Sequence, residues 1–291
     1  MTARRLAFLT GLSLSAFAAN SILCRLALGQ ALIDPISYTI VRLISGALAL
    51  SVLARSFRGS WRAAGMLFLY AAPFSLAYVE LTTGTGALIA FSFVQLTMIS
   101  ASIIGGRHPH PLEWLGMGLA MSGLYLLVRP GLSAPSPFGA VMMATAGTAW
   151  GFYSLIGRRS VDPLKETAGN FARASVLVIV FGFAGLAVSR FGAAFGLPER
   201  MLGFAVVHWS GPGLLLAILS GAVTSALGYV LWYAALRGLT ATRAALVQTS
   251  VPVLAAVGGI LILGEPATAR LAVAGGMILG GILLTYAKKA S

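Results

Sequence analysis

The chain contains an internal duplication, and this feature restricts its fold more than any other. The segment FAANSILCR at residues 17–25 aligns with WGFYSLIGR at residues 150–158. Further positions recur at one constant spacing, with Ser92, Leu96, Gly106, Gly118 and Gly123 matching Ser250, Leu254, Gly264, Gly276 and Gly281. Each copy carries five apolar runs, an odd number, so the second copy enters a membrane upside down. The duplication predicts two inverted halves, residues 1–130 and 131–291, around a pseudo-two-fold axis in the membrane plane.

The composition places both halves in a lipid bilayer. Of the 291 residues, 58% are hydrophobic and 9% are charged, whereas a soluble domain carries roughly 25% charged residues. At roughly 20 residues per spanning helix, the apolar runs predict ten membrane helices, at 6–28, 35–54, 63–80, 83–104, 112–128, 138–157, 166–189, 211–236, 242–263 and 267–287. We therefore expect an all-α polytopic membrane protein of two inverted five-helix repeats, with an external loop at residues 191–210.

The distribution of basic residues predicts the orientation in the membrane. A formal net charge of +13 would suggest a nucleic-acid partner for a soluble protein. Here most of the 20 lysines and arginines fall in the loops on the side of the N-terminus. The positive-inside rule then places both termini in the cytoplasm. We expect no nucleic-acid partner.

The sequence shows no catalytic, metal or cofactor signature. Its one cysteine, Cys24, lies within the first apolar run, which excludes an intrachain disulfide and favours a packing role. His108 and His110 offer too few ligands for a metal site. No phosphate-binding loop or nucleophile–base pair stands out. We expect no enzyme activity, no cofactor and no direct coupling to ATP.

The strongest local motif is LGEP at residues 263–266, which precedes a glycine-rich run. This segment resembles the repeat ending of EamA-type carriers in the drug/metabolite transporter superfamily. Pro35 with Arg42, Arg173 and the aromatic openings of the first and sixth runs are similar to that family too. Within it, the chain most resembles bacterial exporters of aromatic and other amino acids, the YddG type. The resemblance implies a carrier of the bacterial inner membrane whose central cavity opens alternately to either side.

Polar and aromatic residues inside the spans are the candidates for the cavity wall, because they are costly against lipid. The repeat puts Asn20 and Ser21 of the first span in positions equivalent to those around Trp150 and Tyr153 of the sixth. Further candidates for substrate binding are Tyr78, Trp232 and Tyr233, with the mid-helix amides of Gln95 and Gln248. Two alternatives stay open for this set: packing between helices with one satisfied hydrogen bond, and anchoring of the aromatic rings at the membrane interface.

The charged candidates are fewer. Arg42 and Arg173 each lie about eight residues inside a span, where an arginine needs a partner, water or a path to the surface. Each either contacts a substrate carboxylate or takes part in a switching ion pair, or it binds backbone carbonyls and loop ends as a structural residue. Glu80 is the one acid that could couple transport to protons, and Pro252 predicts a bend in the ninth span that either gates the cavity or shapes it.

These observations predict a facilitative exporter of amino acids and related small metabolites. The alternative is a proton-coupled exporter of lipophilic cations, since an aromatic cavity also suits those. That alternative requires an acidic counter-charge, for which only Glu80 is available. One departure from the family concerns the acid of the LGEP motif, because Arg107 stands in the first half where Glu265 stands in the second. We expect the lipid bilayer and an amino acid as partners of a monomeric protein.

Overall fold

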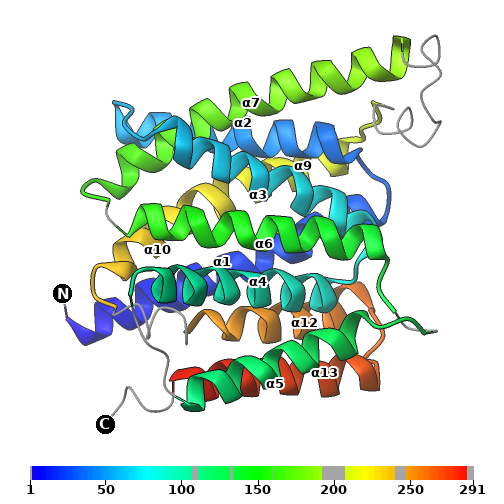
Figure 1. The fold of residues 1–291 in the computed structure, drawn as a ribbon. Helices are drawn as coiled ribbons and strands as arrows, with labels where there is room; N and C mark the ends of the chain where they lie inside the picture. Colours follow the sequence, from blue (N-terminus) through cyan, green and yellow to red (C-terminus); the bar gives the residue numbers. More distant parts are fainter. Residues whose placement is uncertain are drawn as a thin grey trace.

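The computed structural model describes residues 2–106, 111–131, 134–158, 160–191, 207–239 and 247–286. These residues form helices (Figure 1) and, apart from one isolated bridge between Ile33 and Trp209, no strand. The elements are α1 (Ala3–Gly29), α2 (Pro35–Ala54), α3 (Trp61–Glu80), α4 (Thr83–Ile104), α5 (Pro111–Val128), α6 (Pro137–Gly157), α7 (Pro163–Phe191), α9 (Gly211–Ile218), the π-helical segment η3 (Leu219–Leu227), α10 (Gly228–Leu236), α12 (Ser250–Leu263) and α13 (Ala269–Tyr286).

Each predicted span overlaps a helix within these ranges, so the all-helical fold class is confirmed. Seven helices are long and apolar enough to cross a membrane: α1, α2, α3, α4, α5, α7 and the continuous helix formed by α9, η3 and α10. Within the described residues α12 and α13 are apolar but shorter. Helix α6 has 21 residues and buries Trp150 and Tyr153 against neighbouring helices.

The helices begin where the sequence supplies caps. Asp34 accepts hydrogen bonds from the backbone N–H groups of Ile36 and Ser37, and Pro35 occupies the first turn of α2. Ser136 and Ser210 cap α6 and α9 in the same way, again with a proline in the first turn. A side-chain acceptor followed by proline suits a helix start, because the first N–H groups have no partner within the helix. The predicted boundaries are close to the observed ones for this reason.

Helix α1 lies in the interior of the bundle, where it packs against α3, α4, α9, η3, α10 and α12. Helix α6 packs against α3 and α4, whereas α2 with α7 and α5 with α13 form pairs at opposite edges (Figure 1). Helices α1 and α6 run in opposite directions (Figure 1). The start of α1 and the end of α13 lie at the same end of the bundle, which we call the terminal end; the opposite end is the distal end.

Glycines allow the closest helix contacts. A Cβ atom on Gly147 of α6 would lie 2.3 Å from the backbone oxygen of Ala90 on α4, and one on Gly281 of α13 would lie 2.4 Å from the backbone oxygen of Gly116 on α5. Such contacts are typical of helix pairs in membranes, where backbones approach at small residues. The glycine-rich surfaces of α5 and α13 thus pack against each other within the chain, although Gly118 and Gly280 face open space.

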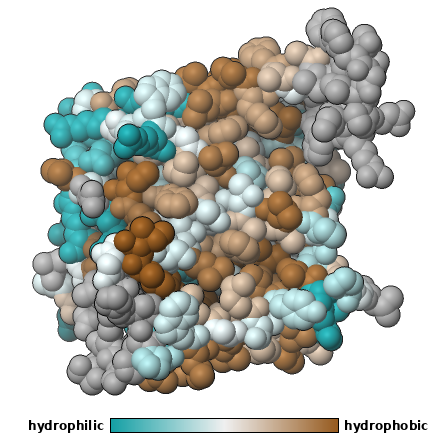
Figure 2. Space-filling model, viewed as in Figure 1, coloured by the Kyte–Doolittle hydropathy of each residue, from teal (hydrophilic) through white to brown (hydrophobic). Residues whose placement is uncertain are grey.

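The surface agrees with a membrane location. Figure 2 shows an apolar band across the middle of the molecule, bordered by hydrophilic residues that are most numerous at the terminal end. Large apolar side chains of several helices are exposed, among them Val52, Tyr125, Phe183 and Leu261. The predicted external loop lies mostly outside the described residues, since 192–206 are not among them.

Candidate functional site

Arg42 of α2 lies at the middle of the bundle, about 10 Å along the helix from its first residue, and its side chain is 1% exposed. Its Nε donates to the Ser225 hydroxyl at 3.0 Å. Its Nη2 donates to the Tyr70 hydroxyl at 3.2 Å and to the Tyr229 hydroxyl at 3.1 Å. These partners come from η3, α3 and α10. One guanidinium therefore connects four helical elements from the first and second parts of the chain.

Asn20 of α1 lies beside this arginine and organises the polar face of η3. Its Oδ1 accepts from Ser220 at 2.7 Å, and from Thr224 and Ser225 at 3.3 Å each. Its Nδ2 donates to the Tyr70 hydroxyl at 3.4 Å. The turns of a π-helix are wider than those of an α-helix, so hydroxyls four and five residues apart can reach one acceptor. Segments of this kind are frequent at functional sites.

Aromatic rings surround the polar groups. The ring centroid of Trp150 lies 4.6 Å from that of Tyr229, 5.0 Å from that of Tyr70 and 5.6 Å from that of Phe17. The guanidinium carbon of Arg42 lies 5.2 Å from the Tyr70 ring centroid, within the range of a cation–π contact. We define Asn20, Arg42, Tyr70, Trp150 and Tyr229 as the central site.

The central site encloses little space. A cavity of ≈20 Å³ is lined by Phe17, Ser21, Tyr70, Phe74, Ala90, Phe91, Val94, Gly147, Trp150 and Tyr229. This volume suffices for about one water molecule. The structure is therefore closed at its centre, and a larger ligand requires the rings to move apart.

Buried tyrosines close the bundle between the central site and the terminal end. The Tyr233 hydroxyl donates to the backbone oxygen of Tyr153 at 3.4 Å, and the two rings stack at a centroid distance of 5.7 Å. Asn170 of α7 donates to the Tyr153 hydroxyl at 3.4 Å and accepts from the backbone N–H of Ser60 at 3.1 Å. Helices α6, α7 and α10 and the start of α3 are joined in this layer.

An ion pair closes the distal end. Arg25 Nε at the end of α1 lies 3.3 Å from Glu265 Oε1, in the connection between α12 and α13. The side chains are 22% and 11% exposed. Arg25 Nη1 also donates to the backbone oxygens of Tyr78 and Val79 at 3.0 and 2.9 Å, and Glu265 accepts from the backbone N–H of Thr83 at 2.8 Å. The pair thus ties α1 to the α3–α4 turn and to the second half of the chain.

Most of the predicted binding residues lie at or next to the central site: Asn20, Ser21 and Trp150 in its wall, Tyr153, Trp232 and Tyr233 towards the terminal end, and Tyr78 towards the distal end. Gln95 lies elsewhere, because it lines a separate cavity of ≈20 Å³ between α4, α5 and α13. Gln248 is buried just before α12, and Pro252 lies in the first turn of that helix. A binding role for each of these residues stays a prediction.

The two predicted arginines have different surroundings. Arg173 Nη1 donates to the backbone oxygens of Arg58 and Gly169 at 2.9 Å each, and its guanidinium lies 6.0 Å from the Trp61 ring centroid. These contacts hold the α2–α3 connection against α7 and agree with the structural interpretation. Arg42 has hydroxyl partners in the core instead.

Glu80 does not lie within the bundle. It is exposed at the end of α3 and accepts a hydrogen bond from the Ser136 hydroxyl, which caps α6. The other acids of the described residues also lie at helix ends or in connections: Asp34, Glu113, Asp162, Glu166 and Glu265.

Several residues of the site were not among the candidates predicted from the sequence. Tyr70 and Phe74 precede Tyr78 at intervals of four, so an aromatic stripe along α3 was a detectable signal. Ser220 and Ser225 gave no signal, because only the π-helical geometry turns them towards Asn20. The pairing of Arg25 with Glu265 joins residues far apart in the sequence and was likewise unpredictable.

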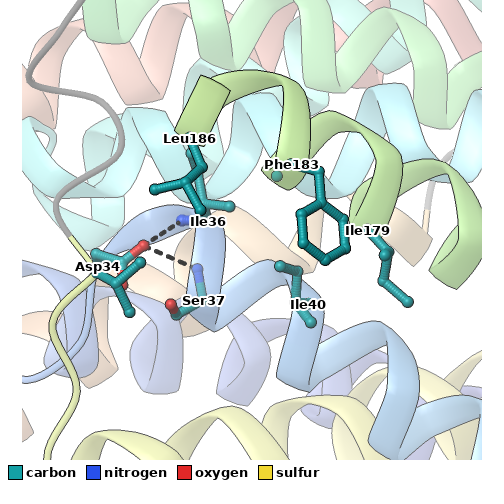
Figure 3. Close-up of a pocket in the computed structure, with 9 residues that line it drawn as sticks. Asp34, Ile36, Ser37, Ile40, Ile179, Phe183 and Leu186 are labelled. Atoms are coloured by element: carbon teal, nitrogen blue, oxygen red, sulfur yellow. Dashed lines mark hydrogen bonds between the residues drawn. The ribbon is translucent and has the colours of Figure 1, made fainter. Parts of the chain in front are cut away.

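Two larger cavities lie on outer faces. One of ≈320 Å³ is an apolar groove between α2 and α7 near the distal end, lined by Ile40, Phe183 and Leu186 with Asp34 at its edge (Figure 3). Another of ≈800 Å³ lies at the terminal end beside Arg62, Arg158 and Glu166. Exposed side chains such as Phe183 and Phe152 line them. The candidate site is therefore the central one, where buried polar groups of many helices converge.

Comparison with known proteins identifies the family of this chain. The model of the EamA-like transporter family matches residues 137–287, about half of the chain. The chain belongs to this family. Its members are membrane transporters, which agrees with the apolar helices and gives no support for an enzyme. A solved crystal structure of a protein, 20% identical, has a TM-score of 0.62 over 94% of this chain and 98% of its own, and shows that the fold is a known one.

Individual proteins are similar to this EamA-family chain over most or part of its length. The protein PA1977 of Pseudomonas aeruginosa is 47% identical over 99% of this chain and 97% of its own length. A transporter of Archaeoglobus fulgidus is 28% identical over 83% of this chain and 77% of its own. The threonine/homoserine exporter RhtA of Salmonella typhimurium is 29% identical over 64% of this chain and 57% of its own. The names of the last two state transport, in agreement with the EamA-like transporter family to which the chain belongs.

Proposed function

We propose that the chain exports amino acids across the bacterial inner membrane by alternating access. The observation that carries the proposal is the central site, in which aromatic rings surround a buried guanidinium whose hydrogen bonds go only to hydroxyls. A positive charge suits a carboxylate, and the rings suit an apolar or aromatic side chain. The similarity to the exporter RhtA supports amino acids as the substrate class, and the aromatic wall supports a specificity of the YddG type.

Alternating access rests on an inverted repeat of ten spans. Three observations support it. Helices α1 and α6 run in opposite directions (Figure 1). The equivalent residues Phe17 and Trp150 touch each other, as residues next to a two-fold axis do. Packing partners are exchanged as well, since α3 packs on α6 while its counterpart α9–η3–α10 packs on α1. Two related halves around one site can rock between states open to opposite sides.

The terminal end is assigned to the cytoplasm. Arg55, Arg58, Arg62, Arg158, Lys165 and Arg237 lie at that end, next to the start of α3, the end of α6 and the start of α7. Fewer basic residues of the described ranges, Arg25, Arg129, Arg190 and Arg270, lie at the distal end (Figure 1). This difference favours a cytoplasmic terminal end by the positive-inside rule.

The competing function, proton-coupled export of lipophilic cations, receives less support. It required Glu80 as an intramembrane counter-charge, and Glu80 is exposed at a helix end. A cation would also meet the positive charge of Arg42 at the central site. The surroundings of Arg42 therefore favour a substrate that carries a negative group.

The test is uptake into proteoliposomes that contain the purified protein. Labelled phenylalanine, threonine and a lipophilic cation are compared, each with and without an imposed pH gradient. We expect saturable uptake of amino acid that does not depend on the pH gradient. Uptake of the cation alone, driven by the gradient, would replace this proposal with the multidrug alternative.

A further inference from the structure

Arg42 has an incomplete set of partners, although it is deeply buried. Its Nη1 atom is inaccessible to solvent and has no hydrogen-bond partner, while Nε and Nη2 donate to the hydroxyls of Ser225, Tyr70 and Tyr229. Burying a guanidinium is costly unless its charge and its N–H groups are matched. Hydroxyls match it poorly, because they carry no charge. The closed state therefore retains an unsatisfied cation at the middle of the bundle.

A second unsatisfied donor belongs to the same cluster of rings. Trp150 Nε1 is buried without a partner, and the Trp150 ring packs against both tyrosines that bind Arg42. An indole N–H can only donate. Trp150 lines the small cavity together with Tyr70 and Tyr229, which are the tyrosine partners of Arg42. Neither donor has an acceptor in the described part of the protein. A carboxylate has two acceptor oxygens and the charge that the guanidinium lacks.

Arg173 shows how this chain treats a structural arginine. It is partly buried and donates to two backbone carbonyls at 2.9 Å, which are fixed acceptors of the folded chain. The partners of Arg42 are side-chain hydroxyls instead, and these can rotate away and bind one another or water. Such partners are suited to temporary replacement, whereas carbonyl partners are suited to permanent contact.

We propose that Arg42 is the specificity residue that binds the carboxylate of the substrate, and that the hydroxyls of Tyr70 and Tyr229 occupy the guanidinium while the site is empty. The proposal rests on the proposed transport function and narrows the substrate to carboxylate-bearing molecules, as against the corresponding amines and amides. Entry of the carboxylate displaces the two hydroxyls and parts the rings around the ≈20 Å³ cavity. Binding and opening of the central site are then linked.

The experiment compares phenylalanine with phenylalaninamide, and threonine with threoninamide, as inhibitors of labelled phenylalanine or threonine uptake in proteoliposomes. We expect the wild-type protein to prefer each acid over its amide by at least about tenfold, because the amide leaves the buried charge unmatched. Arg42→Gln should reduce this preference to near one. Arg173→Gln is the matched control, since it removes an intramembrane arginine and should leave the preference unchanged.

Tyr229→Phe and Tyr70→Phe keep the proposal testable if Arg42→Gln does not fold. Each removes a hydroxyl that competes with the substrate, so the affinity for the acids should rise by about 2- to 10-fold, the worth of one net hydrogen bond, while affinity for the amides stays the same. If Arg42 and the two tyrosine hydroxyls had a structural role alone, the tyrosine substitutions would lower the affinity for the acids and for the amides. The proposal is overturned if the wild-type protein treats acid and amide alike, or if Arg42→Gln retains the preference. Absence of any amino acid uptake by the wild-type protein would refute the proposed function itself.

Discussion

The Arg25–Glu265 ion pair should control how often the distal end opens. The two side chains belong to different halves of the chain, and the pair ties the end of α1 to the connection before α13. Glu265→Gln removes the charge but keeps an oxygen that can accept from the backbone N–H of Thr83. Any effect of this substitution therefore reports the loss of the charge attraction and little else.

The magnitude follows from the geometry. At the observed separation of 3.3 Å, two unit charges attract by about 5 kcal/mol at an effective dielectric constant of about 20. Desolvation offsets part of this attraction, and both side chains are partly exposed, which screens the rest. We expect a net contribution of about 1.5 kcal/mol to the state that is closed at the distal end. Its loss should raise the population of the open state about tenfold.

The assay uses a cysteine at the central site. Cys24 is buried and is the one natural cysteine, so Ser21→Cys in a Cys24→Ala background gives a single target that lines the small cavity. A membrane-impermeant maleimide applied from the distal side labels Ser21→Cys only when that end opens. Glu265→Gln should raise the labelling rate about tenfold, in proportion to the open population.

Two comparisons decide the outcome. Arg25→Gln should raise the rate at least as much as Glu265→Gln does, because it also removes the hydrogen bonds to the backbone oxygens of Tyr78 and Val79. The double variant should add little to Arg25→Gln, because that substitution has already removed the ion pair. Glu80→Gln at the same end is the control and should leave the rate unchanged. An unchanged rate in Glu265→Gln, or fully additive effects in the double variant, would refute the reasoning.

Three further predictions concern other parts of the molecule. Gly147→Ala should lower the free energy of unfolding by about 2 kcal/mol, because the new Cβ would lie 2.3 Å from the Ala90 oxygen. Gly118→Ala, at a position that faces open space, should leave the melting temperature unchanged. Equal melting temperatures of the two variants would contradict this prediction. Trp150→Ala should weaken the affinity for phenylalanine more than that for threonine, measured as apparent KM, and an equal loss for both would speak against stacking. Glu80→Gln should leave the pH dependence of uptake unaltered, and a flattened pH profile would restore Glu80 as a coupling group.

Much of the fold could be predicted because membrane helices follow from local composition. Apolar runs of sufficient length can form only helices in lipid, and prolines and capping residues mark their starts, as Asp34 and Ser136 do for α2 and α6. Local composition does not specify which helices surround a given one: α6 buries Trp150, Tyr153 and Ser154 among its neighbours. Its burial among other helices is a property of the packed bundle and not of its own sequence.

The site could be predicted only in part, for two physical reasons. Asn20 and Trp150 stood out because polar and aromatic groups are costly against lipid and because the repeat placed them in equivalent segments. The same rule also selected Gln95, which lies in a separate cavity, since burial does not specify which helices surround a residue. For Glu80 the sequence left the exposure of the carboxylate open, because a shift of one turn at a helix end decides whether it meets water or the interior; the structure has it exposed at the end of α3.

The duplication also explains why the two ends of the bundle differ. The repeat alignment makes Arg158 the counterpart of Arg25, and Arg107 the counterpart of Glu265. Two arginines cannot form an ion pair. The attraction between Arg25 and Glu265 that stabilises closure of the distal end therefore has no equivalent between Arg158 and Arg107. A carrier with identical halves would favour neither side, whereas this chain should favour closure of the distal end by the net energy of one ion pair. Under the proposed orientation and function, the empty carrier then opens more readily to the cytoplasm, where an exporter binds its substrate. The Arg25–Glu265 pair stabilises the state that is closed at the distal end. Binding of a carboxylate to Arg42 would supply the energy that offsets this stabilisation and allows that end to open.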